Sequence, residues 1–390
     1  MTRQSLILVM VLGLLVSSAG FMAGVQLEEL RGGRTDSSAL MTGDPPTERA
    51  TDRAHDERVW PIADERTDGR VRAEFEHQDA LILGVNELIQ YHQETLAKMV
   101  AAIHDKIKIL GVIANDDQRL KTIELLKSHG LPENSIDFFQ WPVEAMWVRD
   151  YAPFFVVGSH MTAVDFTYPE QNRDLEDNFA VAFAATFRLH YDHCRLTLEG
   201  GNLTSNGDGL CITSTKVIDR NALRGYTVEH VGDLLSQHFH FKRWVHVRPL
   251  DDEPTGHADM FVTLAGINKA VVGFYSANED PVNAKILDEN AAALKGEPTK
   301  SGPMEVFRVP MPNHRDGNWR TYTNVIYANG VVLVPQYPDA DPEADKVALR
   351  VFHEVLPDWK VVGIDCSRII TKRGALHCIS RNVPSLGDGK

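Results

Sequence analysis

The sequence has few cysteines, no excess of positive charge and only one long hydrophobic run. Its 390 residues include four cysteines, so a scaffold built on disulfide bonds is excluded. Acidic residues (54) outnumber basic residues (40), which argues against nucleic-acid binding through a general basic surface. The acidic balance slightly favours cationic ligands, although such a surface more often serves only solubility. Hydrophobic (43%) and charged (24%) residues are near globular averages, which excludes a mainly disordered chain and a polytopic membrane protein.

The one long hydrophobic run lies at the N-terminus. Residues 6–16 are apolar apart from Gly13, follow Arg3, and precede the small residues 17–20. This order is typical of a secretory signal peptide, and the run is shorter than the ~20 apolar residues of a spanning helix. The sequence therefore predicts a cleaved signal over residues 1–24 and a periplasmic or secreted protein. An uncleaved membrane anchor is the alternative, and no other membrane contact is expected.

The remainder divides into a linker and a folded part. Residues 25–59 mix acidic and basic side chains with Pro45 and Pro46 and show no apolar period, so we expect a disordered, charged linker. Residues 60–390 alternate short apolar runs with helical spacing and are expected to form one α/β catalytic domain. Its recurrent unit is a hairpin, a helix and a further strand, repeated about five times.

The apolar patterns and turn signals place the individual elements. Helices are expected around 88–103, 120–131, 178–190, 227–239, 283–294 and 342–355. Strands are expected at 107–114, 154–157, 161–166, 196–203, 210–218, 260–264, 270–275, 323–328, 331–335 and 360–364. The dipeptide Asn329-Gly330 between two of these strands is the preferred type I′ hairpin turn.

Five short segments carry residue types suited to catalysis. They contain Trp147, Arg149 and Asp150; Glu199, Gly200, Gly201 and Asn202; His257 and Asp259; Tyr322 and Asn324; and His377 and Cys378. Taken singly, each segment is more often structural, as an ion pair, a turn or a buried inert thiol. The adjacent glycines indicate a place where the backbone approaches another group closely. His257 and Asp259, if on a strand, would face the same side.

In this order, the five segments resemble those of the guanidine-modifying (pentein) superfamily. The most similar branch contains the agmatine deiminases and the peptidylarginine deiminase of oral bacteria. The resemblance runs from about Arg72 to Pro384. It implies a five-bladed α/β propeller of ββαβ modules around a pseudo-fivefold axis, in agreement with the recurrent unit counted above. It also implies an activity that converts guanidino groups to ureido groups, and it implies no metal and no cofactor.

The residue types suit that chemistry. A guanidinium is a planar cation whose donors pair with carboxylates, and Asp150 and Asp259 supply two. A thiolate such as that of Cys378 can attack the central carbon, and His257 can protonate the leaving ammonia and then activate water. The expected path is covalent, through an S-alkylthiouronium on Cys378.

The resemblance assigns further residues to the site. Asn324 matches an asparagine that orients the thiol or the water, and Trp147 matches an aromatic wall for the alkyl stem. Glu199 is expected to hold a nearby arginine such as Arg149. Arg173 matches one of the arginines with which the peptidylarginine branch binds the carboxylate of a C-terminal arginine.

Substrate choice stays open at this point. The predicted export and the segment 373–376 before the histidine-cysteine pair favour arginine-containing peptides or proteins, peptidyl or C-terminal, over agmatine. Pro254 and Thr255 stand where the peptidylarginine branch has larger pocket residues, which weakens that preference. Agmatine is the second candidate, and free arginine or another guanidino compound is the third.

Two non-deiminase interpretations are weighed beside these, and the state of the other cysteines is a separate question. A guanidino-binding protein without catalysis is disfavoured by the intact set of Cys378, His257, Asp150 and Asp259. A metal site that includes His377 and Cys378 is disfavoured because adjacent residues of a strand face opposite sides. The remaining cysteines are expected as buried thiols, although an exported chain permits one disulfide among Cys194, Cys211 and Cys366.

Overall fold

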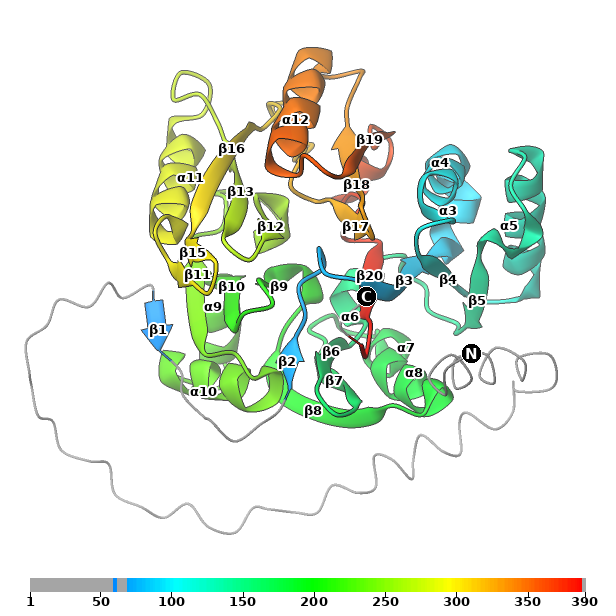
Figure 1. Cartoon of the computed structure of the whole chain (residues 1–390), viewed down its shortest axis with the longest axis horizontal. Coiled ribbons are helices and arrows are strands. Elements are labelled where there is room, and N and C mark those ends of the chain that lie inside the picture. Colours follow the sequence, from blue (N-terminus) through cyan, green and yellow to red (C-terminus); the bar gives the residue numbers. More distant parts are fainter. Residues whose placement is uncertain (1–58, 62–68, 388–390) are drawn as a thin grey trace, which may run out of the picture.

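A computed structural model of the chain describes residues 59–61 and 69–387. The predicted signal at 1–24 and all of the predicted linker except Val59 lie outside the described residues. The described part is a mixed α/β fold, in which α5, α10, α11 and α12 lie at the periphery of the view in Figure 1. Among these residues, no helix is both long and apolar enough to cross a membrane.

Five of the six sheets in the described part share one plan. Two strands pair antiparallel, and a helical connection then leads to a third strand that is parallel to the second. Three of these sheets are β9 (Leu203–Ser205), β10 (Leu210–Ser214) and β11 (Arg243–Val247), with β1 (Val59–Pro61) at the edge; β12 (Val262–Gly266), β13 (Lys269–Phe274) and β16 (Glu305–Pro310); and β17 (Ile326–Ala328), β18 (Val331–Gln336) and β19 (Lys360–Asp365).

The other two sheets of this plan lie nearest the first motif. They are β6 (Phe154–Val157), β7 (Met161–Thr167) and β8 (His190–Thr197), with β2 (Arg70–Val71) at the edge; and β20 (Ser380–Pro384), β3 (Gln78–Gly84), β4 (Lys108–Ile113) and β5 (Asp137–Gln140). The sixth sheet is the small hairpin of β14 (Pro298–Thr299) and β15 (Gly302–Pro303).

The helices follow the sequence signals closely. They are α3 (Val85–Tyr91), α4 (Gln93–Ile103), α5 (Asp116–Ser128), α6 (Val148–Tyr151), α7 (Asp174–Asp177), α8 (Phe179–Phe187), α9 (Lys216–Ala222), α10 (Val228–Phe239), α11 (Pro281–Leu294) and α12 (Pro342–Val355). The side chain of Asp341 caps α12 by accepting from the Ala344 amide, and Pro342 stands at its first turn. The bounds predicted for this helix are therefore confirmed.

Three predicted elements differ in kind from the structure, and others differ in their bounds, such as the helix expected at 120–131 (Asp116–Ser128) and the strand expected at 323–328 (Ile326–Ala328). The helix expected at 88–103 is two helices, because the backbone leaves helical angles at His92 (φ −135°, ψ 40°) while the apolar spacing continues across the break. The strand expected at 196–203 is interrupted by the 3₁₀ turn Gly200–Asn202. The apolar pattern did not show this turn, because the leucines on both sides of it are buried. The strand expected at 210–218 ends at Ser214, and α9 follows it.

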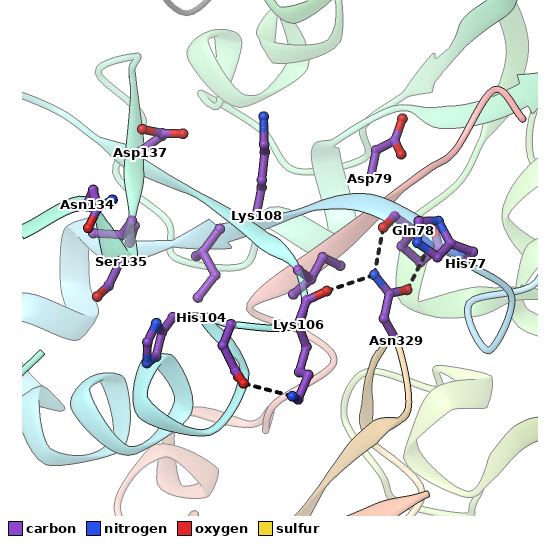
Figure 2. Close-up of a pocket in the computed structure, with 14 residues that line it drawn as sticks. His77, Gln78, Asp79, His104, Lys106, Lys108, Asn134, Ser135, Asp137 and Asn329 are labelled. Carbon is purple, nitrogen blue, oxygen red and sulfur yellow. Dashed lines mark hydrogen bonds and ion pairs between the residues drawn. The ribbon is translucent and has the colours of Figure 1, made fainter. Parts of the chain in front are cut away.

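The last strand of the described part pairs with an early one. Strand β20 pairs antiparallel with β3, with Ser380 opposite Leu83. The predicted turn Asn329-Gly330 is confirmed, with positive φ at both residues (44° and 89°). The side chain of Asn329 also bonds to the backbone of Gln78: its Oδ1 accepts from the Gln78 N–H at 2.9 Å, and its Nδ2 donates to the Gln78 carbonyl at 2.9 Å (Figure 2). These bonds tie the β17–β18 hairpin to β3.

Candidate active site

The five segments singled out from the sequence converge at the end of β3 that adjoins α3. They are the loop that leads into α6, the 3₁₀ turns Gly200–Asn202 and Ala258–Met260, the segment before β17, and the turn before β20. The contacts that join them run from the Arg149 amide to the Cys378 carbonyl (3.1 Å), from the Gly201 amide to Asp150 Oδ1 (3.2 Å), from Thr323 Oγ1 to the Asp259 carbonyl (3.1 Å) and from Asn324 Nδ2 to Cys378 Sγ (3.2 Å).

The two adjacent glycines lie where the backbone passes close to other groups. A Cβ on Gly200 would collide with the Arg149 carbonyl and with the guanidinium of Arg381. A Cβ on Gly201 would lie 2.7 Å from His257 Nδ1, 2.9 Å from Asp259 Oδ2 and 3.1 Å from Asp150 Oδ1. Three polar atoms therefore converge on a small space that exists because residue 201 has no side chain.

His257 and Asp259 reach this space from a turn and not from a strand. His257 precedes the 3₁₀ turn Ala258–Met260, so the strand alternation expected from the sequence does not apply. The imidazole Nε2 of His257 lies 2.9 Å from Glu199 Oε2, and its Nδ1 lies 3.8 Å from Asp150 Oδ1. Asp259 Oδ1 is buried and has no hydrogen-bond partner within the described residues. An unpartnered buried carboxylate oxygen is costly unless a ligand donates to it.

The thiol of Cys378 borders the same space. Its Sγ is 3.2 Å from Asn324 Nδ2 and 3.8 Å from Asp259 Oδ2. A Cβ on Gly374 would lie 2.5 Å from the Trp147 indole and 3.1 Å from Cys378 Cβ. Trp147 and Cys378 therefore both lie against Gly374, and the absence of a side chain at this residue makes room for them.

Two predicted side chains have other partners than expected. Glu199 pairs with Arg220 and His257, whereas Arg149 pairs with Glu74 at 2.5 Å, so the expected Glu199–Arg149 pair is wrong. The sequence could not show this because Glu74 and Arg220 lie outside the five motifs. Arg173 pairs with Glu144 at 2.8 Å and approaches Glu176 at 3.5 Å, and its described contacts do not include the atoms around Gly201.

Sequence reasoning missed the roles of three charged groups at the site, of which Arg381 and His377 are buried and Glu74 is partly buried. Glu74, which precedes β3, receives hydrogen bonds from Arg149 and from His377. Arg381 in β20 donates to the Arg149 carbonyl at 2.7 Å, and its guanidinium lies 4.0 Å from the Phe154 ring centre. His377 was considered only as a metal ligand facing away from Cys378. That argument assumed a strand, but residues 376–379 form a turn, and both His377 Nδ1 and Cys378 Sγ approach Asp259 Oδ2.

The charges around Gly201 shift one another strongly. Burial raises the pKa of Asp150 to about 6, with the neighbouring Glu199 adding to the rise against the opposing charge of His257. Burial lowers the pKa of His257, but Asp150 and Glu199 outweigh it and raise the value to about 10. Burial next to Asp259 and Asp150 holds the pKa of the Cys378 thiol well above its usual range. At neutral pH the site thus combines a protonated imidazole, carboxylates and a neutral thiol.

Metal and disulfide chemistry were the open alternatives. Within residues 59–61 and 69–387, no three or more histidine, cysteine, aspartate or glutamate side chains are grouped so that they could hold a metal ion. All four cysteines are free and buried, so the disulfide that the sequence left open is not formed.

A separate hollow lies at the N-terminal ends of β3, β4 and β5, away from the end of β3 where the five motifs meet. It is lined by the first residues of β3, β4 and β5 and by the Asn329 turn, with Asp79, Lys108 and Asp137 around its rim (Figure 2). None of the five motifs contributes to it, so it does not belong to the cluster around Gly201.

Comparisons with known proteins give one consistent result. A family model described as Porphyromonas-type peptidyl-arginine deiminase matches residues 70–384. A curated Legionella pneumophila (strain Paris) protein named "Putative agmatine deiminase" is 23% identical over 319 residues, covering 75% of this chain and 90% of that protein.

Solved structures agree with the family match at the level of the fold. The agmatine deiminase of Enterococcus faecalis has a TM-score of 0.71 at 18% identity, covering 82% of this chain and 97% of that chain. A C. jejuni agmatine deiminase with substrate bound has a TM-score of 0.70 at 19% identity, covering 81% and 96%.

Proposed function

The chain belongs to the Porphyromonas-type peptidyl-arginine deiminase family, and on this premise we propose that it hydrolyses a guanidino group to a ureido group and ammonia through a covalent bond to Cys378. Membership makes the chain a hydrolytic deiminase of the agmatine/peptidyl-arginine type. The finer statements below, on residue roles, substrate and location, are the proposal. The family match lies within the predicted catalytic domain, residues 60–390.

One observation carries the assignment of the guanidinium position. Asp259 Oδ1 is a buried acceptor without a partner, next to the space at Gly201 that is bounded by Asp150, Asp259 and His257. A guanidinium placed there donates to a carboxylate on each side and ends the isolation of Oδ1. Its central carbon then lies beside the thiol of Cys378. Asn324 orients that thiol, and the Trp147 indole packs on the alkyl stem.

The reaction proceeds in two halves. The cationic guanidinium offsets the carboxylate charges that disfavour the thiolate, so the Cys378 thiol loses its proton once substrate is bound. The sulfur then bonds to the guanidino carbon. His257 gives its proton to one amino group, the carbon–nitrogen bond breaks, and ammonia leaves an S-alkylthiouronium.

In the second half, neutral His257 takes a proton from a water molecule that attacks the same carbon. The carbon–sulfur bond breaks, the hydroxyl proton passes to the departing sulfur as the carbonyl forms, and the ureido product leaves with the thiol of Cys378 restored. Glu199 holds the far side of the imidazole throughout, at 2.9 Å, and keeps His257 oriented and protonated at the start of each cycle.

The pKa shifts predict a bell-shaped pH dependence of kcat/KM. We expect an acid limb near pH 6, because Asp150 takes up a proton as the pH falls through that value and no longer binds the cation. We expect an alkaline limb near pH 10, because His257 loses the proton that the leaving ammonia requires. Initial rates of ammonia release at low substrate concentration measure both limbs. An activity that stays constant as the pH falls well below 6 would contradict the role of Asp150.

The structure shifts the balance between the candidate substrates. The carboxylate clamp expected for C-terminal arginine relied on Arg173, and two glutamates already face that guanidinium. The curated relative from Legionella pneumophila and the two solved structures carry the name agmatine deiminase. We therefore place agmatine first, giving N-carbamoylputrescine, and peptidyl or C-terminal arginine second, giving citrulline.

A substrate panel decides between them. Protein comprising residues 60–390 is offered agmatine, free arginine, a peptide with internal arginine and a peptide with C-terminal arginine. We expect kcat/KM for agmatine to exceed the others by about tenfold or more, since Arg173, the expected partner of an α-carboxylate, already faces Glu144 and Glu176. A preference for C-terminal arginine that Arg173→Gln abolishes would reverse the order. No turnover of any of the four would sink the deiminase assignment as stated.

Two further proposals concern the whole chain. The proposed export over residues 1–24 predicts that protein recovered outside the cytoplasm begins near residue 25; recovery in the cytoplasm with Met1 retained would refute it. The five sheets of common plan support the five-bladed propeller. A crystal structure in which these sheets do not surround one axis would refute that arrangement.

A further inference from the structure

A histidine that the mechanism above does not use lies between two carboxylates. His377 is buried; its Nδ1 lies 2.7 Å from Asp259 Oδ2, and its Nε2 lies 3.0 Å from Glu74 Oε2. An ionised carboxylate only accepts hydrogen bonds, so each ring nitrogen must carry a proton to make both contacts. The geometry therefore describes an imidazolium that bridges Asp259 and Glu74.

The surroundings of His377 fix the far end of this bridge. Glu74 Oε1 also accepts a hydrogen bond from Arg149 Nη1 at 2.5 Å, and Arg149 Nε donates to the His377 carbonyl at 3.2 Å. The positive charge of Arg381, in β20, also lowers the pKa of Glu74. Cys378 directly follows His377 in the chain. Burial and the Arg149 charge lower the pKa of His377, but Glu74 and Asp259 outweigh them and leave it raised.

We propose that His377 is a positioning residue, which as an imidazolium holds Asp259 Oδ2 and thereby leaves Asp259 Oδ1 free to receive the substrate guanidinium. The observation behind this division of labour is that Oδ2 has the histidine while buried Oδ1 has no partner. The inference rests on the proposed function, since the guanidinium is the group that Oδ1 awaits. It adds a group that never touches the substrate.

The charge of His377 matters as much as its hydrogen bonds. Asp150, Asp259 and Glu199 crowd around one small space, and like charges in a buried site make one carboxylate retain a proton. The imidazolium offsets this repulsion on the side of Asp259. Without it, the uncompensated charge of Asp259 makes Asp150 keep its proton to higher pH, and a protonated Asp150 no longer attracts a guanidinium.

The kinetic test replaces His377 by glutamine, which can donate one hydrogen bond but carries no charge. We expect His377→Gln to lower kcat/KM at pH 7 by about tenfold or more, chiefly through KM. We also expect its acid limb, near pH 6 in the wild type, to move up by about one pH unit, which adds up to a further tenfold loss at pH values below that limb. The loss should shrink as the pH is raised.

A matched control uses the same substitution at another histidine–aspartate pair, which is partly buried. His238 Nδ1 lies 2.7 Å from Asp192 Oδ2 in the contact between α10 and β8. His238→Gln should leave both KM and the acid limb unchanged. An unshifted acid limb in His377→Gln, or an equal shift in His238→Gln, would overturn the proposal and assign His377 a purely structural role.

A second measurement does not depend on turnover. Nitrogen NMR of the full chain labelled at histidine should show both ring nitrogens of His377 protonated at about pH 8, above the ordinary histidine pKa of about 6.5. The signal is assigned by its loss in His377→Gln or, if that variant does not fold, in His377→Asn. A neutral tautomer at this pH would overturn the proposal even in an active enzyme. A protonated ring in a protein that turns over no guanidine would instead isolate the failure to the proposed function.

Discussion

Replacing Cys378 by alanine is expected to abolish deimination, with a fall in kcat of about 10⁴-fold or more. The sulfur is the atom that bonds to the guanidino carbon, and removal of a covalent nucleophile has effects of this size. Substrate should still bind, because Asp150 and Asp259 are untouched. Stopped-flow or end-point assay of ammonia gives the rate, and calorimetry gives the retained affinity.

The chain offers a matched control for this change. Cys194 in β8 is equally buried, and none of its described contacts is to the five motifs. Cys194→Ala should therefore keep kcat, at some cost in thermal stability. Mass spectrometry of wild-type protein quenched during turnover should also find a peptide with Cys378 that has gained the substrate less ammonia. Substantial activity in Cys378→Ala would show that the covalent route is wrong.

The second large effect is expected from a single methyl group. Gly201→Ala places a carbon 2.7–3.1 Å from three polar atoms, of His257, Asp259 and Asp150. These atoms must move apart, and the methyl group competes with the guanidinium for the space between them. Displacements near 1 Å at a reacting centre cost about 10²-fold, so we expect kcat/KM to fall by at least about that factor.

The fold should survive this substitution. Gly201 has no positive φ, so alanine fits its backbone conformation, unlike Gly200, whose Cβ would strike a carbonyl. A circular-dichroism melt checks this point. Gly266→Ala is the control, because a Cβ there meets only the Lys269 side chain at 3.4–3.5 Å. If Gly201→Ala binds and turns over substrate normally, the guanidinium lies elsewhere.

The sequence predicted the plan of the fold and the segments that form the site better than it predicted the contacts between the residues of the site. Hairpin signals such as Asn329-Gly330 and cap signals such as Asp341-Pro342 act over a few residues, so their elements were predictable. The break at His92 was not predictable, because the spacing of the buried apolar residues continues from α3 into α4.

The partners of the site residues were beyond sequence reasoning for a different reason. Glu74 meets His377 across 303 residues of chain, and no local pattern marks it. The carboxylate partner of Arg149 is Glu74 and not the expected Glu199, and Glu74 lies outside the five motifs. Spacing shows which residues share a strand or turn, whereas ion pairs between distant segments depend on how the sheets meet.

That separation of 303 residues has a consequence for the way the protein becomes active. The nucleophile stands two residues before β20, and β20 is held by β3, a strand from the early part of the described chain. Contacts between such distant segments close late, because the entropy of a very long loop must first be overcome. Partly assembled forms therefore lack a working thiol however well their separate sheets have formed. Recovery of activity during refolding should thus be the last signal to return, and it serves as a sensitive assay for the completely folded molecule.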